Sequence, residues 1–215
     1  MKQVTNLKEL YTKSVYTHFT HAKEGGGDYC VEQKGNTLYI YFEGSDGKED
    51  WLNNFNFFAK PYKGMKHTWR VHRGFLKIWK GMEDDIKPYL MNESVEHVII
   101  AGFSQGAALA LLCHEWCSFN RPDLADTENI EGYGFGHPRV VWGRLPKAVK
   151  ERFKGYTVIT CKKDIVTHLP PVIFFFKHVG DRIKVGSKAK YGPIEAHMHY
   201  AEYLNAYQEE LSLKN

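Results

Sequence analysis

Residues 96–112 combine a short apolar strand, a sharp glycine-bounded turn and the start of a small-residue helix. The turn at residues 102–106 reads GFSQG, with Ser104 at its centre. A serine at the tip of such a turn needs small residues two positions to either side, because the backbone folds back tightly there. Gly102 and Gly106 meet that need. The pattern therefore predicts an α/β fold with a serine exposed at the end of a strand.

The helix that begins after Ser104 indicates what this serine does. Free backbone N–H groups and the positive end of the helix dipole lie at a helix N-terminus, where they favour the negative charge that develops in acyl transfer. We therefore interpret Ser104 as a nucleophile. The alternative is a glycine-bounded turn in which the serine is incidental.

Length and charge limit the classes of protein to which the chain can belong. Its 215 residues suffice for one substantial core, so we expect a single domain over residues 1–215. The net charge is +4, but no run of Lys or Arg is typical of nucleic-acid binding, so we expect no nucleic-acid partner.

The cysteines and the N-terminal segment indicate the compartment. Four cysteines form neither a dense framework nor a Cys-x-x-Cys pair, so we interpret them as reduced thiols. The first ten residues lack the apolar stretch of a signal peptide, and no segment reaches the length of a membrane span. We expect a soluble chain with no integral membrane segment, either cytoplasmic or secreted with a signal that this chain does not contain.

Strand and helix patterns alternate along the chain. Apolar runs predict strands at 38–42, 69–72, 133–136 and 156–161, besides the strand before Ser104. Helical spacing predicts helices at 5–22, 75–92, 145–153 and 196–213, besides the one after Ser104. This alternation indicates a mostly parallel central sheet with helices on both faces. The apolar run 172–176, with a turn at 180–181 and residues 183–185, predicts an antiparallel hairpin at the sheet's edge.

A serine hydroxyl is a weak nucleophile at neutral pH, so Ser104 needs a general base, and that base needs an orienting carboxylate. In sheets of this kind the chain order is Ser, then Asp or Glu, then His. Asp164 directly follows the predicted strand 156–161, and catalytic groups collect beyond the carboxyl ends of such strands. The other candidate acids lie in a polar loop and are interpreted as surface charges: Asp123, Asp126, Glu128 and Glu131.

Two histidines are candidates for the general base. His197 and His199 lie where a loop meets the last predicted helix, a place from which a side chain can reach the carboxyl edge of the sheet. The remaining later histidines are interpreted as structural or solvent-exposed: His114, His137, His168 and His178. Position alone leaves His197 and His199 both open.

Six blocks carry a family resemblance that covers most of the chain. They are YFEGS (41–45), DWLNNF (50–55), VHRGF (71–75), GFSQGA (102–107), FGHPRV (135–140) and DIVTHLPP (164–171). No single block is decisive, but six in this order are specific. Together they resemble the class 3, or fungal-type, lipase family.

The resemblance implies an α/β-hydrolase fold in which Ser104 is the nucleophile and Asp164 the triad acid. It favours His197, in the block IEAH (194–197), over His199 as the base. It also implies an oxyanion hole made by Ser45 and the backbone N–H of Gln105.

The resemblance further assigns residues 46–58 to a lid segment, with Trp51, Leu52 and Phe55 on its apolar side. A fixed helix packed on the core is an equal alternative for this segment. Many family members have His and Leu where this chain has Phe103 and Gln105, so we expect a different pocket wall with Phe103 beside the substrate.

These expectations favour a serine carboxylic ester hydrolase of lipase or esterase type, acting on acyl esters such as glycerides at a lipid–water interface or in solution. Phospholipase A1 and feruloyl esterase use the same chemistry and stay open, as does a catalytically silent lipase-like binding protein. A metal hydrolase is suggested by the eleven histidines and by the pair His197 and His199, but no cluster of Glu or Asp lies nearby at the spacing of metal ligands. We expect no metal and no cofactor.

Overall fold

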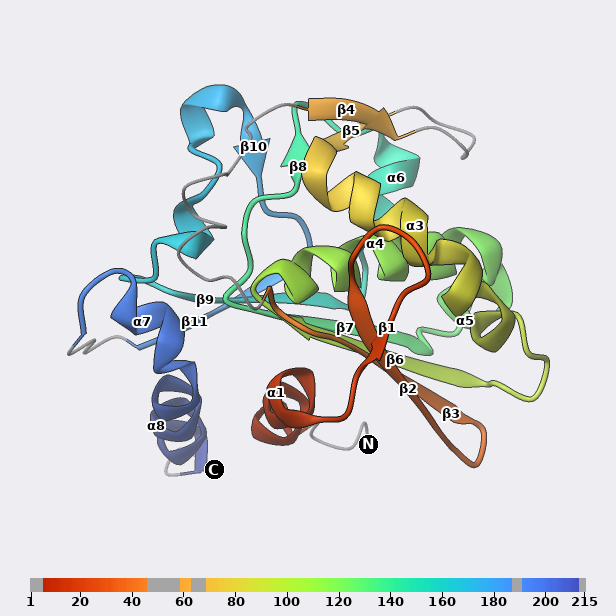
Figure 1. Cartoon of the computed structure of the whole chain (residues 1–215), viewed down its shortest axis with the longest axis horizontal. Coiled ribbons are helices and arrows are strands. Elements are labelled where there is room, and N and C mark those ends of the chain that lie inside the picture. Colours follow the sequence, from red (N-terminus) through yellow and green to blue (C-terminus); the bar gives the residue numbers. More distant parts are fainter. Residues whose placement is uncertain (1–5, 46–58, 63–68, 187–190, 213–215) are drawn as a thin grey trace.

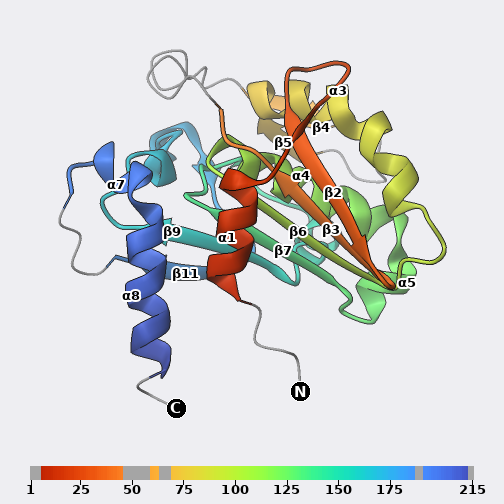
Figure 2. The ribbon, with the colours of Figure 1, turned by 60° about the horizontal axis from the view of Figure 1, so that its bottom comes forward.

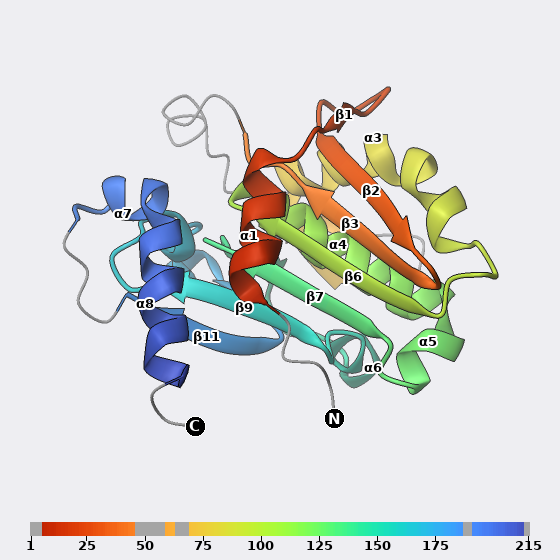
Figure 3. The ribbon, with the colours of Figure 1, turned by 90° about the horizontal axis from the view of Figure 1, so that it is seen from below.

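The structure is a computed structural model that describes residues 6–45, 59–62, 69–186 and 191–212. A seven-stranded sheet forms its centre, and a smaller four-stranded sheet lies beside helix α3 at one side (Figure 1). Helices cover both faces of the large sheet (Figures 2 and 3).

The large sheet is parallel except at one edge, where two strands run antiparallel to their neighbours. Its strands, in spatial order, are β1 (Thr20–His21), β2 (Asp28–Lys34), β3 (Thr37–Phe42), β6 (His97–Phe103), β7 (Ile130–Phe135), β9 (Tyr156–Cys161) and β11 (Asp181–Val185). The antiparallel small sheet has the order β10 (Phe176–Lys177), β8 (Val141–Trp142), β5 (Trp69–His72) and β4 (Ala59–Tyr62).

The helices connect these strands and close the chain. They are α1 (Leu7–Tyr16), α3 (Arg73–Leu90), α4 (Gln105–Asn120), α5 (Pro122–Asp126), α6 (Lys147–Glu151), α7 (Glu195–Met198) and α8 (Tyr200–Ser212). Two 3-10 turns, η1 (Val166–His168) and η2 (Val172–Phe174), follow β9. Among the described residues, no helix is both long enough and apolar enough to cross a membrane.

Alternate side chains of each central strand enter two different cores. In β6, Val98 and Ile100 pack with α3 and α4, whereas Ile99 and Ala101 pack on the opposite face with α1 and α8. This period of two is the pattern of a strand buried on both faces. Helix α4 lies between the sheet and α3, and residues 106–117 are all buried (Figure 1). The position of α4 explains why residues 106–113 are apolar on every side.

The predicted mostly parallel sheet with helices on both faces is confirmed, and an antiparallel hairpin does lie at one edge. That hairpin is β2–β3, which turns at Gly35 with φ +59°. The hairpin predicted over residues 172–185 is wrong, because 172–174 form a 3-10 turn and β11 pairs parallel with β9. Two prolines precede that apolar run and lack N–H groups for a sheet ladder, and residues 172–175 are exposed.

Helix boundaries differ from the predicted ones at both ends of the chain. The first helix begins at the predicted Asn6 cap, whose side chain accepts from the Glu9 N–H at 3.2 Å, but it ends at Tyr16. The last predicted helix is divided at His199 into α7 and α8. This division places His197 on a short helix of its own. All four cysteines carry free thiols, as the sequence predicts.

Candidate active site

Ser104 occupies a turn between β6 and α4 that only glycines can flank. A Cβ atom on Gly102 would collide with the carbonyl of Gly106, and one on Gly106 would collide with the carbonyl of Phe42. Ser104 itself has φ +57° and ψ −118°, a backbone conformation that residues with a side chain rarely adopt. Such strain persists only where surrounding structure imposes it, and it is typical of functional sites.

Neighbouring strands impose this conformation. The Ser104 N–H donates to the carbonyl of Phe135 on β7 at 2.9 Å, and the Ser104 carbonyl accepts from the Ala107 N–H at 3.1 Å. The serine is thus tied to the adjacent strand on one side and to the first turn of α4 on the other. The serine lies at the C-terminal end of strand β6, as the sequence predicts, but the predicted exposure is wrong, because Ser104 is buried at 6% exposure.

Asp164 lies just beyond β9 and is fully buried. Its Oδ1 accepts the Val166 N–H at 2.8 Å, and its Oδ2 lies 2.8 Å from Nδ1 of His197. Because an ionised carboxylate only accepts hydrogen bonds, this contact assigns the proton to Nδ1. The Nε2 atom of His197 is then the nitrogen that is able to accept a proton.

Phe103 and Gly136 hold the imidazole ring of His197 in place. The Phe103 ring stacks on it with centroids 4.6 Å apart and an interplanar angle of 20°. Gly136 has φ +57°, and a Cβ there would lie 2.8 Å from Cε1 of His197 and 3.0 Å from Cε2 of Phe103. The backbone at Gly136 therefore lies so close to both rings that a side chain there would collide with them. Since Phe103 directly precedes Ser104, the stack brings His197 beside the strained turn.

His199 has different surroundings. Its ring stacks on Tyr191 with centroids 4.1 Å apart, and its Nδ1 lies 3.2 Å from Glu202. The side chain is about half exposed, whereas His197 is buried. Of the two histidines that the sequence left open, His197 is therefore the one that pairs with Asp164.

The segment before Ser45 runs alongside the turn at Ser104. A Cβ on Gly44 would lie 3.5 Å from Cβ of Ser104 and 3.3 Å from the Phe103 carbonyl. Ser45 directly follows Gly44, and Gln105, the first residue of α4, directly follows the serine. Trp51, Leu52 and Phe55, with the whole segment 46–58, lie outside the described residues.

Three other histidines have pKa values that are lowered by burial: His114 and His137, which are fully buried, and His178, which is partly exposed. Burial lowers the pKa of His114 to about 4, and His114 packs edge to face on Tyr156. Burial is also the main cause that lowers the pKa of His137 to about 4 and that of His178 to about 3. At neutral pH these groups are uncharged, which fits a structural role.

Sequence reasoning missed the contacts that orient His197. The stack on Phe103 joins residues 94 positions apart, and no local pattern reports such a contact. Only the glycine at position 136, directly after a core strand, carried a signal, because such a glycine often marks a close approach of the backbone.

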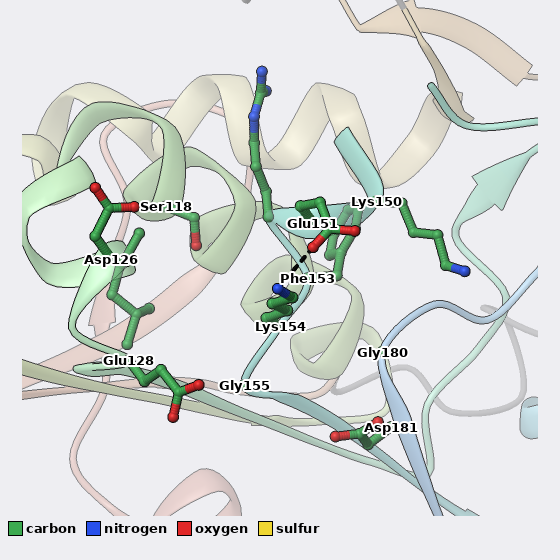
Figure 4. A pocket seen from close by; sticks show the side chains of 13 residues that line it. Ser118, Asp126, Glu128, Lys150, Glu151, Phe153, Lys154, Gly155, Gly180 and Asp181 are labelled. Atoms are coloured by element: carbon green, nitrogen blue, oxygen red, sulfur yellow. Dashed lines mark ion pairs between the residues drawn. The ribbon is translucent and has the colours of Figure 1, made fainter. Parts of the chain in front are cut away.

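A hollow lies at the opposite end of the sheet, where β7, β9 and β11 begin (Figure 4). Its volume is about 900 Å³, and its lining includes charges of both signs, such as the ion pair between Glu151 and Lys154 at 2.8 Å. It contains neither Ser104 nor His197. Within the described ranges, no group of three or more His, Cys, Asp or Glu side chains is placed to hold a metal ion.

The chain is similar to known proteins over most of the residues that form this site. Residues 39–174 match the class 3 lipase family, a range that includes Ser104 and Asp164 but ends before His197. A lipase of Rhizomucor miehei is 29% identical over 180 residues, which are 82% of this chain and 48% of that protein. The chain thus spans about half the length of the curated relatives that it matches.

Solved structures agree with the fold. The triacylglyceride lipase of Rhizomucor miehei superposes with a TM-score of 0.69 at 22% identity, over 86% of this chain and 80% of that chain. A triacylglycerol lipase whose catalytic centre is a serine-protease triad superposes with a TM-score of 0.66 at 26% identity, over 80% of this chain and 66% of that one. The fold is that of the α/β-hydrolases, and the chain belongs to the class 3 lipase family.

Proposed function

We propose that this chain is a serine carboxylic ester hydrolase that cleaves acyl esters, such as those of glycerides, through Ser104, His197 and Asp164. The observation that carries the proposal is the buried 2.8 Å contact between Asp164 and His197 beside the strained turn at Ser104. Membership of the class 3 lipase family supports it, as does the serine-protease triad of the similar triacylglycerol lipase.

In the proposed reaction, Nε2 of His197 accepts the proton of the Ser104 hydroxyl while its Oγ attacks the ester carbonyl carbon. The carbonyl π electrons move to oxygen, which gives a tetrahedral oxyanion. Asp164 holds the imidazole in the required tautomer and stabilises the imidazolium ion, without becoming protonated. The buried position of Asp164 strengthens this electrostatic effect.

Collapse of the oxyanion breaks the bond to the alcohol, which leaves with the proton that His197 held, and an acyl-enzyme on Ser104 remains. Water then repeats the sequence and releases the carboxylic acid. We assign the oxyanion to the backbone N–H groups of Gln105, which directly follows the serine, and of Ser45, which follows the Gly44 that lies beside it. Each donor of this kind typically contributes about 3 kcal/mol to the lowering of the barrier.

The substrate class within this chemistry includes lipid esters, and the proposed lid at residues 46–58 would respond to a lipid surface. The exposed apolar residues Ile194 and Met198 on either side of His197 support an apolar rim around the site. Phe103 forms the wall behind the imidazole, and we propose that its edge also limits the acyl pocket.

Covalent labelling and kinetics test the proposal together. A serine-directed phosphonate is expected to label Ser104 in the folded chain, as mass spectrometry of the peptides would show. Failure to label it, with the fold intact by circular dichroism, would favour a lipase-like binding protein. Hydrolysis of nitrophenyl esters of increasing chain length, below and above the onset of micelles, measures the acyl preference and the response to an interface. Faster hydrolysis of a feruloyl ester than of the nitrophenyl esters would indicate a feruloyl esterase rather than a lipase.

A further inference from the structure

The turn at residues 172–175, here called the apolar tip, exposes four consecutive large apolar side chains. Ile173 is 75% exposed and Phe175 is 68% exposed, and Val172 and Phe174 are also exposed. In Figure 1 the tip is the sky-blue turn beside β10 at the upper left. A contiguous exposed run of this kind in a water-soluble fold indicates an interaction surface.

The backbone holds this tip in a fixed and strained conformation. Phe175 has φ +64° and ψ +16°, which is unfavourable for a bulky residue. Its carbonyl accepts from the Gly143 N–H at 2.9 Å, and its N–H donates to the carbonyl of Val172 at 2.8 Å. The guanidinium of Arg139 donates to the carbonyl of Pro170 at 2.9 Å, at the base of the tip. These hydrogen bonds hold the turn that carries the exposed side chains in one conformation. Backbone strain that is held in place in this way is typical of functional segments.

Cations surround the tip. The Phe175 ring packs on Trp142 with centroids 6.1 Å apart, and the guanidinium of Arg70 lies 4.9 Å from the centre of the same indole. Arg144 follows Gly143, which is bonded to the tip, and Lys177 follows the tip in β10. Partial burial, and then the charges of Lys150 and Arg144, lower the pKa of Lys177, which shows that these cations lie close together.

The stretch of sequence that contains the tip is more basic than the rest of the chain, and it includes Arg152 and Lys154, which are paired with Glu115 and Glu151. Residues 139–184 contain eleven Lys and Arg against three Asp and Glu, whereas the remaining residues contain 18 and 22. Of the three acids, Asp164 is buried against His197 and Glu151 is paired with Lys154. An anionic surface is the chemical complement of this segment.

We propose that the apolar tip and its surrounding cations form a docking surface for lipid bilayers that carry anionic headgroups. The side chains of Ile173 and Phe175 enter the headgroup boundary, and Arg70, Arg144 and Lys177 contact the anionic groups. This inference rests on the proposed function, because lipid esters are the substrates proposed for the site. The tip follows Asp164 by eight residues, and docking there holds the chain at an ester-bearing surface.

Vesicle binding by the full chain with Ser104→Ala tests the docking without hydrolysis. We expect binding to phosphatidylcholine vesicles that contain phosphatidylserine to be at least about tenfold tighter than to phosphatidylcholine alone, and to weaken with added salt. Equal binding to both vesicles, or no binding, would overturn the proposal. A stable dimer in sedimentation that is lost on Ile173→Ser would also overturn it, because the tip would then cover a second copy.

Substitutions separate the two parts of the surface. Ile173→Ser is expected to weaken binding to both vesicles, whereas Arg144→Gln with Lys177→Gln is expected to weaken only anionic binding, by about tenfold. Matched controls are Tyr16→Ser, 75% exposed on α1, and Lys8→Gln with Lys77→Gln, which are exposed on α1 and α3. If the controls weaken binding as much as the test variants do, the surface is not the one proposed.

The same substitutions with Ser104 intact are expected to keep wild-type turnover of a soluble short-chain ester. Loss of vesicle binding with soluble turnover retained supports the docking surface. Absence of turnover in every chain, including wild type, counts against the proposed function and leaves the vesicle result valid.

Discussion

The two ends of the large sheet differ in how firmly their polar side chains are held and how much water reaches them. Where β7, β9 and β11 begin, a hollow of about 900 Å³ is lined by charges of both signs, and the ion pair between Glu151 and Lys154 is largely exposed (Figure 4). Where the strands end, Ser104 and the Asp164–His197 pair are buried and held by backbone contacts.

This difference shows which features indicate chemistry. A large opening with solvated charges provides neither fixed geometry nor a low dielectric, so its groups behave much as they do in water. A strained serine next to a buried carboxylate and imidazole has both. The carboxyl ends of the strands are also where ligands bind in open α/β sheets. Predictions that contrast the two ends therefore test this reasoning.

The largest effect is expected from Ser104→Ala, which removes the proposed nucleophile. Hydrolysis of a soluble nitrophenyl ester is expected to fall by about 10⁴-fold or more, measured as kcat/KM. Ser118→Ala is the matched control, because Ser118 lies near the other end of the same helix and lines the hollow. Activity of Ser104→Ala above a few per cent of wild type would refute the assignment.

The two histidines near α7 are expected to respond very differently to substitution. His197→Ala removes the group bonded to Asp164, and a fall in kcat of about 10³-fold or more is expected. His199→Ala removes only a half-exposed ring stacked on Tyr191, and a change in kcat below about threefold is expected. A larger loss in His199→Ala than in His197→Ala would reverse the assignment of the base.

At the other end of the sheet, His114 lies beside Gly132 and is expected to affect stability rather than catalysis. Its folded pKa of about 4 lies below the unfolded value near 6.5, so between these values the unfolded chain binds more protons. The neutral His114 therefore contributes its full share to the free energy of unfolding above about pH 6.5. This contribution, about 3 kcal/mol, is lost as the pH falls to about 4.

Urea unfolding at pH 7 and pH 4 measures this loss. His114→Gln is expected to reduce the difference in unfolding free energy between the two pH values, and the exposed His18→Gln is the control. His137 and His178 act in the same direction. Burial raises the pKa of Glu115 to about 7, despite Arg152 nearby, so this group acts in the opposite direction. An unchanged difference in His114→Gln would contradict the prediction.

A smaller effect is expected from Phe103→Leu, which removes the ring that stacks on His197. Because the ring positions the proposed base, kcat is expected to fall by about three- to tenfold with KM for a short-chain ester nearly unchanged. Phe103→Tyr keeps the stack and is expected to restore most of kcat. A rise in KM alone would instead assign Phe103 to substrate binding.

The smallest effect is expected from the hollow itself. Lys154→Gln with Asp126→Asn changes two charges that line it, yet kcat/KM on a soluble ester is expected to stay within about twofold of wild type. A fall comparable to that of Phe103→Leu would show that the two ends of the sheet are coupled.

The sequence predicted the parts of the fold and site that local patterns determine. The glycines around Ser104 and the strand before Asp164 each specify their own geometry, and both residues lie where expected. The strand predicted at 172–176 is wrong for residues 172–174, which form an exposed 3-10 turn, because an apolar run becomes a buried strand only where partner strands exist; only Phe176 enters a strand, β10.

The choice between His197 and His199 depended on tertiary contacts. Both follow the same loop, and a difference of two residues on adjoining short helices sends the two rings to opposite surroundings. The contacts with Asp164 and Phe103 join residues 33 and 94 positions away. Such pairings depend on how the strands are ordered in the sheet, which no local pattern contains.

The complete burial of residues 106–117 in α4 also has a consequence for how the protein unfolds on heating. Amide protons in such a helix exchange with deuterium only when the whole domain opens, since no partial opening exposes a helix surrounded by other elements. Ser104 is mounted on the first turn of that helix. Its geometry is therefore expected to be lost in the global transition rather than before it.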